Sequence, residues 1–209
     1  GLYSSALPYG NDIANAYNYN PEEAKRLLDQ AGYIDSNGDG IREMNGQNIV
    51  IEYYESADHG SSDASIIAQS IQNEAKEIGI TIHINQVENL SDIKAAGAFD
   101  MCSANDSTAP TGDPEVFLQL HYRSGAEGNI ARYNNPAIDQ LIATLAGTFS
   151  IEERQALSKG ISEILLEDAA SLYVSYLPLN TVSSSKVEGA DQHPVDYYMV
   201  TKDIRIRND

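Results

Sequence analysis

The stretch IVIEYYESADHGSSDASIIAQSIQNEAKEIGITIHI, residues 49–84, decides the fold class of this chain. It opens with β-branched and aromatic residues, 49–54, which favour a strand, and because the run is continuous we expect that strand to be buried on both faces. From residue 62 to 78 alanine and isoleucine recur at helical spacing until Gly79, and a second β-branched run, 80–84, follows at once. Strand, helix and strand within about 35 residues indicate a crossover between parallel strands, so we expect an α/β fold.

Helix caps and turn residues predict further elements on both sides of this unit. Residues that can cap a helix, several of them followed by proline or by glutamate in the first turn, stand at Asn20, Ser91, Asp113, Asn135 and Ser150. We expect a helix to begin at each of these positions. Residues 99–103 are expected to form a third strand, and residues 172–177 a further one, before an extended tail.

The composition limits the class of partner. The chain has 209 residues, of which 42% are hydrophobic, enough for one substantial core and a small second unit. With 13 Lys plus Arg against 31 Asp plus Glu, its net charge of -18 repels phosphates, so no nucleic acid partner is expected. No run in the sequence approaches the roughly 20 apolar residues of a membrane-spanning helix. Cys102 is the only cysteine, which excludes an internal disulfide.

The motifs of common enzyme classes are missing from the sequence. There is no G-x-S-x-G elbow, no H-E-x-x-H helix, no Walker loop and no dinucleotide-binding glycine pattern, so we expect no enzyme. Two other classes stay open. One is a carbohydrate- or cell-surface-binding module, in which the 13 tyrosines could form stacking platforms. The other, which has less support, is an acid-base hydrolase using Asp106 and Asp113.

Several short segments follow one another in an order that is similar to one family of transport proteins. They are YNPEEAKRLL (19–28), DSNGDGIRE (35–43), FDM (99–101), DPEVFL (113–118), NNPAID (134–139), SIEER (150–154) and EDA (167–169). Together they resemble the oligopeptide-, dipeptide- and nickel-binding proteins of ATP-binding-cassette (ABC) importers, family 5 of the extracellular solute-binding proteins. Each segment alone is a common cap or turn, and it is their collinear order over nearly the whole chain that is specific.

The resemblance implies a periplasmic-binding-protein-like fold of class II, in which a mixed sheet is flanked by helices. It implies that residues 1–171 are the ligand-closing C-terminal lobe, and that residues 172–209 are return strands and a tail towards a missing N-terminal lobe. Proteins of this family bind a small peptide or a nickel chelate between two lobes and deliver it to an ABC permease. We therefore expect an extracytoplasmic, monomeric binding protein, periplasmic or anchored as a cell-surface lipoprotein, that requires no cofactor.

The resemblance places the ligand at the loop after the third strand. The expected contacts are Asn105, Asp106, Ser107 and Thr108, and the Asp106 carboxylate could pair with the amino group of a peptide. A solvated loop or an Asx turn is the structural alternative. Peptide binders of the family usually carry a tryptophan near this loop, whereas this chain contains none, which departs from the peptide-binding pattern.

A nickel chelate is the other expected ligand. The tail VDYYMVTKD (195–203) is more similar to the nickel-binding branch, which can place a metal-facing histidine in the region of His121 and Arg123. An ordinary surface histidine is the alternative for His121. His83 lies within a predicted strand, where packing or simple exposure explains it. Two weaker candidates for a metal ligand are His59 and His193.

Residues 35–43 copy the first half of a calcium-binding loop. Oxygen-bearing side chains that could converge on Ca²⁺ alternate along it, at Asp35, Asn37 and Asp39. The second half departs from the pattern, because Gly46 stands where a bidentate glutamate is required, and Glu43 would have to replace that residue. A structural calcium ion and an unoccupied polar turn are therefore both open.

Overall fold

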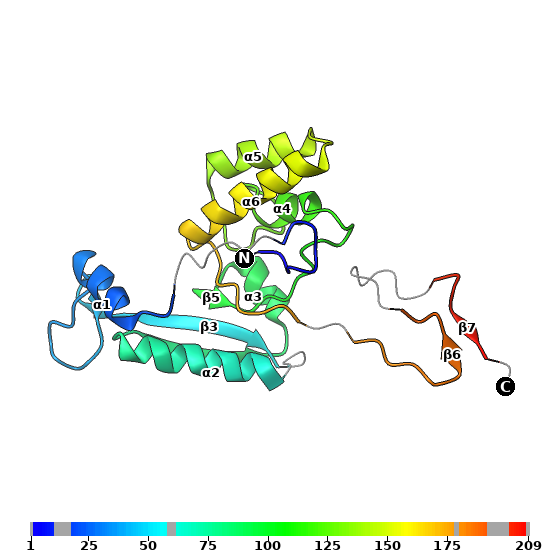
Figure 1. The fold of residues 1–209 in the computed structure, drawn as a ribbon. Coiled ribbons are helices and arrows are strands. Elements are labelled where there is room, and N and C mark those ends of the chain that lie inside the picture. Colours follow the sequence, from blue (N-terminus) through cyan, green and yellow to red (C-terminus); the bar gives the residue numbers. More distant parts are fainter. Residues whose placement is uncertain (1, 11–17, 58–61, 178–179, 192–200, 208–209) are drawn as a thin grey trace. The chain divides into compact units, whose positions relative to one another are not determined.

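The computed structural model describes residues 2–10, 18–57, 62–177, 180–191 and 201–207 (Figure 1). The chain forms two compact units. One is the segment Tyr17–Asn105, and the other joins Gly1–Ala16 to Asp106–Asp209. None of the described helices has the length and the apolar character needed to cross a bilayer.

The segment Tyr17–Asn105 is built on a three-stranded parallel sheet. β3 (Val50–Ser56) and β4 (Thr81–Val87) pair along their whole length in parallel register. α2 (Ser62–Glu77) connects these two strands and packs mainly against β4, and β5 (Met101–Cys102) pairs with the other side of β3 (Figure 1). The strand order β4-β3-β5 confirms the predicted crossover, the third strand and the α/β class.

The prediction that β3 is buried on both faces is wrong. Of its residues only Glu55 is buried, with 2% of its surface exposed, whereas Val50 is 40% exposed. α2 covers one face, where Ser65 Oγ donates to Glu55 Oε1 (3.0 Å). Because side chains alternate along a strand, the opposite face carries the polar pair of Glu52 and His83. This second face is therefore partly open to solvent.

Short elements complete the sheet unit. α1 (Pro21–Gln30) begins as predicted, with the Asn20 side chain accepting a backbone N–H of the first turn (3.0 Å). The predicted cap at Ser91 is wrong, because Asn89 holds the N-cap position and its side-chain amide donates to Asp92 Oδ2 (2.7 Å). The remaining elements are the antiparallel hairpin of β1 (Glu43–Met44) and β2 (Gln47–Asn48) and the helix α3 (Leu90–Ala96).

The other unit is a cluster of three helices, two of which begin after the predicted caps Asn135 and Ser150, whereas the first has Pro114 in place of the predicted Asp113 at its N-cap. They are α4 (Glu115–His121), α5 (Pro136–Ala146) and α6 (Ile151–Glu167). α5 packs against both of the others. Their shared core is closed to solvent, and its apolar side chains with 0% exposure are Leu118, Ile138, Leu145, Ile161 and Leu165. Leu2 and Tyr3, each 3% exposed, belong to the same core, so the N-terminal segment is part of this helical unit.

Arg154 ties three parts of the helical unit together. Its guanidinium forms a two-point ion pair with the Asp113 carboxylate and also reaches Glu115 Oε2 (3.1 Å). Its Nη1 donates to the carbonyls of Leu145 and Thr148 (2.6 Å each). These contacts, first of all the hydrogen bonds to Asp113, raise the pKa of Arg154 above its usual range. α6 is therefore fixed both to the start of α4 and to the end of α5.

The segment 172–177 forms no strand, which corrects the sequence prediction. Leu172 and Val174 are 65% and 53% exposed, and no described strand pairs with the segment. A strand needs a neighbour for its backbone hydrogen bonds, and an apolar, β-branched sequence alone does not supply one. The segment is held to the helical unit by side chains instead, as where Tyr173 Oη lies 2.9 Å from Tyr122 Oη.

The described residues of the C-terminal part beyond this segment include a short strand pair. β6 (Val187–Glu188) and β7 (Arg205–Ile206) run antiparallel, and Glu188 Oε1 accepts a hydrogen bond from Arg207 Nε (2.6 Å). Most of the tail that was expected to be extended, residues 192–200, lies outside the described residues. The expected lobe boundary at residue 171 stays a prediction.

Candidate functional site

The carboxyl ends of the parallel strands define the candidate ligand edge of the sheet. In open α/β sheets ligands bind at this edge, in the loops that follow the strands. β3 and β4 end there at Ser56 and Val87, and β5 ends at Cys102. The Ser103 N–H still donates to the Tyr54 carbonyl (3.0 Å), so the following loop leaves the sheet only at residue 104. The predicted ligand-binding loop therefore begins at the edge where the fold favours a ligand.

Most side chains of this loop are exposed, and among the described residues they have no bonding partners. Asn105, Asp106 and Ser107 are exposed, and Thr108 is half-buried. None of these four side chains forms a hydrogen bond or an ion pair with another described residue, so the Asx turn considered for Asp106 is not formed. Asn105 ends one compact unit, and Asp106 begins the other. The Asp106 carboxylate is therefore available to a cationic group of a ligand.

His121 and Arg123 lie at the end of α4. His121 is the last residue of the helix, and its ring packs against Phe117 with the ring centroids 4.6 Å apart. The Arg123 side chain is exposed. In the part of the chain that the structure describes, no group of three or more His, Cys, Asp or Glu side chains is arranged to hold a metal ion. The described residues thus bring fewer than two further side chains of these types to a metal ion at His121.

Of the three other histidines in the sequence, the structure describes His83. His83 Nδ1 lies 2.8 Å from Glu52 Oε1, and the His83 side chain is 57% exposed, in agreement with simple exposure. Asn85 Nδ2 donates to the second Glu52 oxygen (2.7 Å), and the bonds from Asn85 and His83 lower the pKa of the Glu52 carboxyl. His59 and His193 lie outside the described residues.

The loop of residues 35–43 is a self-contained polar turn. The two Asp35 carboxylate oxygens accept backbone N–H groups three and five residues ahead (2.7 and 2.8 Å). The Asn37 and Asp39 side chains each accept the N–H two residues ahead (2.8 Å), and Glu43 Oε2 accepts another N–H of the loop (2.8 Å). The oxygens that a calcium ion would need are thus bonded to the chain itself, and the structure supports the polar turn.

Sequence reasoning missed a buried carboxylate in the sheet unit. Glu55 Oε1 accepts hydrogen bonds from Ser65 Oγ (3.0 Å) and Gln86 Nε2 (2.8 Å), whereas its buried Oε2 has no partner among the described residues. Glutamate near the end of a strand is ordinarily exposed, so the sequence carries no signal for this burial. The three side chains form a polar cluster between α2 and the carboxyl end of β3 and β4.

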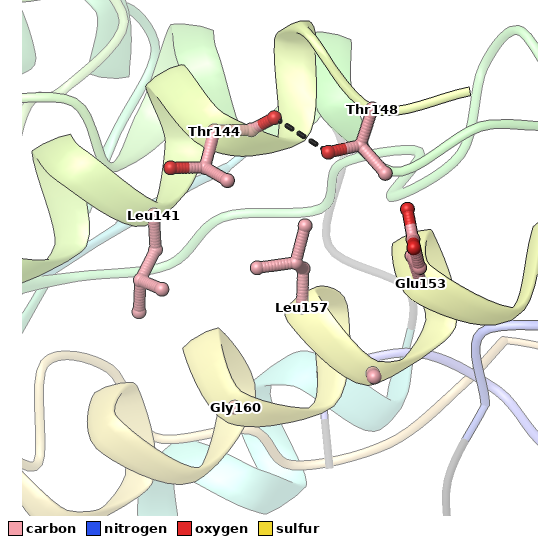
Figure 2. Close-up of a pocket in the computed structure, with 7 residues that line it drawn as sticks. Leu141, Thr144, Thr148, Glu153, Leu157 and Gly160 are labelled. Atoms are coloured by element: carbon pink, nitrogen blue, oxygen red, sulfur yellow. Dashed lines mark hydrogen bonds between the residues drawn. The ribbon is translucent and has the colours of Figure 1, made fainter. Parts of the chain in front are cut away.

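A groove between α5 and α6 was also missed. It has a volume of about 440 Å³ and is lined by Leu141, Thr144, Thr148, Glu153, Ala156, Leu157 and Gly160. Figure 2 shows Leu141 of α5 and Leu157 of α6 pointing into the space between the two helices. The one sequence signal for the groove is Gly160, a helix-weakening residue inside an otherwise helical pattern.

The sequence matches one family and its curated members. Residues 1–129 match the model of the bacterial extracellular solute-binding proteins, family 5 Middle. The nickel-binding periplasmic protein of Escherichia coli strain K12 is 30% identical over 202 residues, which are 93% of this chain and 37% of that protein. The chain therefore spans well under half the length of this relative.

Two solved structures share the fold. NikA from Staphylococcus aureus in complex with Ni(L-His)2 is 26% identical with a TM-score of 0.75, and the match covers 98% of this chain and 41% of that one. The mannohexaose-bound periplasmic oligopeptide-binding protein from Thermotoga maritima is 26% identical with a TM-score of 0.68. That match covers 78% of this chain and 32% of the other. These likenesses confirm the periplasmic-binding-protein-like fold. Since the family model matches more than half of its residues, the chain belongs to the family 5 bacterial extracellular solute-binding proteins.

Proposed function

We propose that this chain is the ligand-closing part of the substrate-binding component of an ABC importer. The observation that carries the proposal is the family match over residues 1–129, to which the 30% identity with a nickel-binding relative adds support. The ligand, a small peptide or a nickel chelate, is held by closure of two lobes and passed to the permease without covalent chemistry. The protein acts outside the cytoplasm, as a monomer that is periplasmic or anchored at the cell surface.

The two ligand chemistries use different residues of the candidate site. A peptide places its ammonium group against Asp106, whose exposed carboxylate has no partner among the described residues, and hydrogen-bonds to Asn105, Ser107 and Thr108. A nickel chelate brings its own ligands and gains the His121 imidazole as one more. The NikA structure, which holds Ni(L-His)2, supports a chelated ion over a bare one.

Calorimetric titration of the protein that contains this chain together with its N-terminal lobe tests the proposal. The ligands are nickel with free histidine and, separately, a pool of di- to pentapeptides. If nickel with histidine gives heat, His121→Ala should weaken that binding roughly tenfold or more; if peptides give heat, Asp106→Asn should do so. Asp191→Asn, which neutralises an exposed carboxylate outside the candidate site, serves as the control and should leave both titrations unchanged. The absence of a binding heat with both ligands would contradict the proposal.

An oligosaccharide is the second candidate ligand. The observation that favours it is the mannohexaose bound to the oligopeptide-binding protein from Thermotoga maritima, which shares this fold. Sugar rings stack on aromatic side chains, and the chain contains 13 tyrosines. Mannohexaose should be titrated in the same series. If it is the only ligand that gives a binding heat, an oligosaccharide replaces the peptide and the nickel chelate as the proposed ligand.

A further inference from the structure

The groove between α5 and α6 is open to solvent at its exposed lining residues Thr144, Glu153 and Ala156, and the proposed function does not use it. On α6 its lining residues Glu153, Ala156, Leu157 and Gly160 follow the spacing of a single helix face. The side chains that α6 buries in the core, Ile161 and Leu165, stand on other positions of the helix. Leu141 and Leu157 are partly buried and pack against that core, so the groove lies at the edge of the core, where its apolar side chains reach solvent.

Gly160 keeps this groove hollow without serving the packing of the chain. A Cβ atom added at Gly160 would meet nothing within 4 Å, so no neighbouring atom requires a glycine there. Glycine in the interior of a helix such as α6 weakens that helix relative to alanine. Ala156, one turn earlier on the same face, is also small and exposed. Small side chains here leave room for a partner to approach the helix backbone closely.

The two threonine hydroxyls of the groove donate their hydrogens to the helix backbone and can act toward an occupant only as acceptors. Thr144 Oγ1 donates to the Gln140 carbonyl (2.8 Å), and Thr148 Oγ1 donates to the Thr144 carbonyl (2.8 Å), as the dashed line in Figure 2 shows. Small-ligand pockets present several converging polar groups that orient the ligand. This groove offers no side-chain donor among its lining residues, only the acceptors of Thr144, Thr148 and Glu153, so apolar side chains of a protein fit it better than a small molecule.

The exposed acidic side chains around the groove indicate the charge that a partner must carry. Glu152, Glu153 and Glu163 are exposed along α6, whereas its one exposed base, Lys159, is paired with Glu163 (3.8 Å). Phe149, in the loop between the helices, is 90% exposed directly after the groove residue Thr148. An occupant must therefore combine apolar side chains with positive charge.

We propose that the groove between α5 and α6 docks a basic amphipathic helix of a partner protein. The apolar side chains of that helix enter the hollow at Ala156 and Gly160, and its Lys and Arg side chains meet Glu152 and Glu153. This interaction is independent of which ligand the protein transports, because it uses none of the residues of the candidate ligand site.

A synthetic Leu-Lys amphipathic helix of roughly 14 residues, close to four turns, is the probe. Fluorescence anisotropy with the full 209-residue chain should show saturable binding. A Leu-Glu peptide with the same leucine positions should bind at least about tenfold more weakly, because the acidic residues repel it. Amide shift changes in NMR spectra should concentrate on α5 and α6. Equal binding of the two peptides, or shifts spread over the whole chain, would overturn the proposal.

Gly160→Leu fills the hollow and should weaken binding of the Leu-Lys peptide by roughly tenfold or more. The variant removes a glycine from a helix interior, so it should fold at least as well, which circular dichroism checks. Ala143→Leu adds the same bulk at an exposed α5 position outside the groove and should change affinity less than about twofold. If Gly160→Leu does not fold, Ala156→Leu takes its place. Equal binding by the groove variant and Ala143→Leu would show attraction by net charge alone and refute a specific groove.

Discussion

The two compact units differ in how completely they bury their apolar side chains. The helical unit encloses Leu118, Ile138 and Leu145 at 0% exposure, together with partners on α6. Among the described residues of the segment Tyr17–Asn105, the buried apolar side chains are Ala68 (3%) and Ile82 (6%). Apolar burial is the main term that stabilises a fold. The helices therefore supply most of the stability of this chain, whereas the sheet supplies the geometry of the candidate ligand edge.

The largest expected effect contrasts two isoleucines, one from each unit. Ile142 in α5 is 1% exposed, whereas Ile84 in β4 is half-buried. Ile142→Ala should cost about 3–4 kcal/mol of unfolding free energy and Ile84→Ala about 1–2 kcal/mol, because only the first leaves a fully enclosed cavity. Urea unfolding followed by circular dichroism measures both. Equal losses would show that the two units contribute alike.

Two arginines with little exposed side-chain surface, one in each unit, allow a second comparison of the stability of the two units. Arg154 and Arg42 are 11% and 12% exposed, but the partner of Arg42 is Asp29, which is 59% exposed, whereas Asp113 is 31% exposed. Arg154→Met should cost about 2–4 kcal/mol, because it strands a partly buried carboxylate, and Arg42→Met about 1–2 kcal/mol, because Asp29 returns to water. Thermal unfolding of both variants checks the order, and a larger loss at Arg42 would reverse it.

The smallest effects concern one exposed carboxylate in each unit. Hydrogen bonds from Tyr133 and Asn135 lower the pKa of Asp168 from 3.8, and bonds from neighbouring side chains lower that of Glu52 from 4.5. A lowered pKa stabilises the fold above the unfolded value, and this contribution is lost as the pH falls through the folded value. Asp168→Asn and Glu52→Gln should therefore lower Tm at neutral pH, and the difference from the native chain should shrink below about pH 4. A Tm difference that does not change with pH would mean that the charge of the carboxylate contributes nothing.

Local signals made a large part of the fold predictable from the sequence. Asn20, Asn135 and Ser150 each cap the helix that they were expected to begin, because a cap bonds to backbone groups two or three residues away. At Ser91 the same reasoning was wrong by two positions, since Asn89 holds the N-cap position there without a side-chain bond to the helix backbone. The crossover of β3, α2 and β4 was readable because one uninterrupted stretch contains it.

What could not be predicted depends on partners that are distant in the chain. The burial of Glu55 is set by Ser65 and Gln86. The segment 172–177 has the composition of a strand but finds no neighbour among the described strands. The exposed loop with Asp106 was located by family likeness and by its place after a strand, whereas the groove arises only when two helices pack.

Leu2 and Tyr3 complete a core whose other side chains come mainly from α4, α5 and α6. The whole segment Tyr17–Asn105 stands between these two contributions in the chain. During synthesis on the ribosome, the whole sheet unit is made before the helices that cover Leu2 and Tyr3. Loop-closure entropy grows only slowly with length, so the final stability loses little, but contacts between such distant residues form slowly. The more deeply buried unit is therefore expected to be the last to form during synthesis.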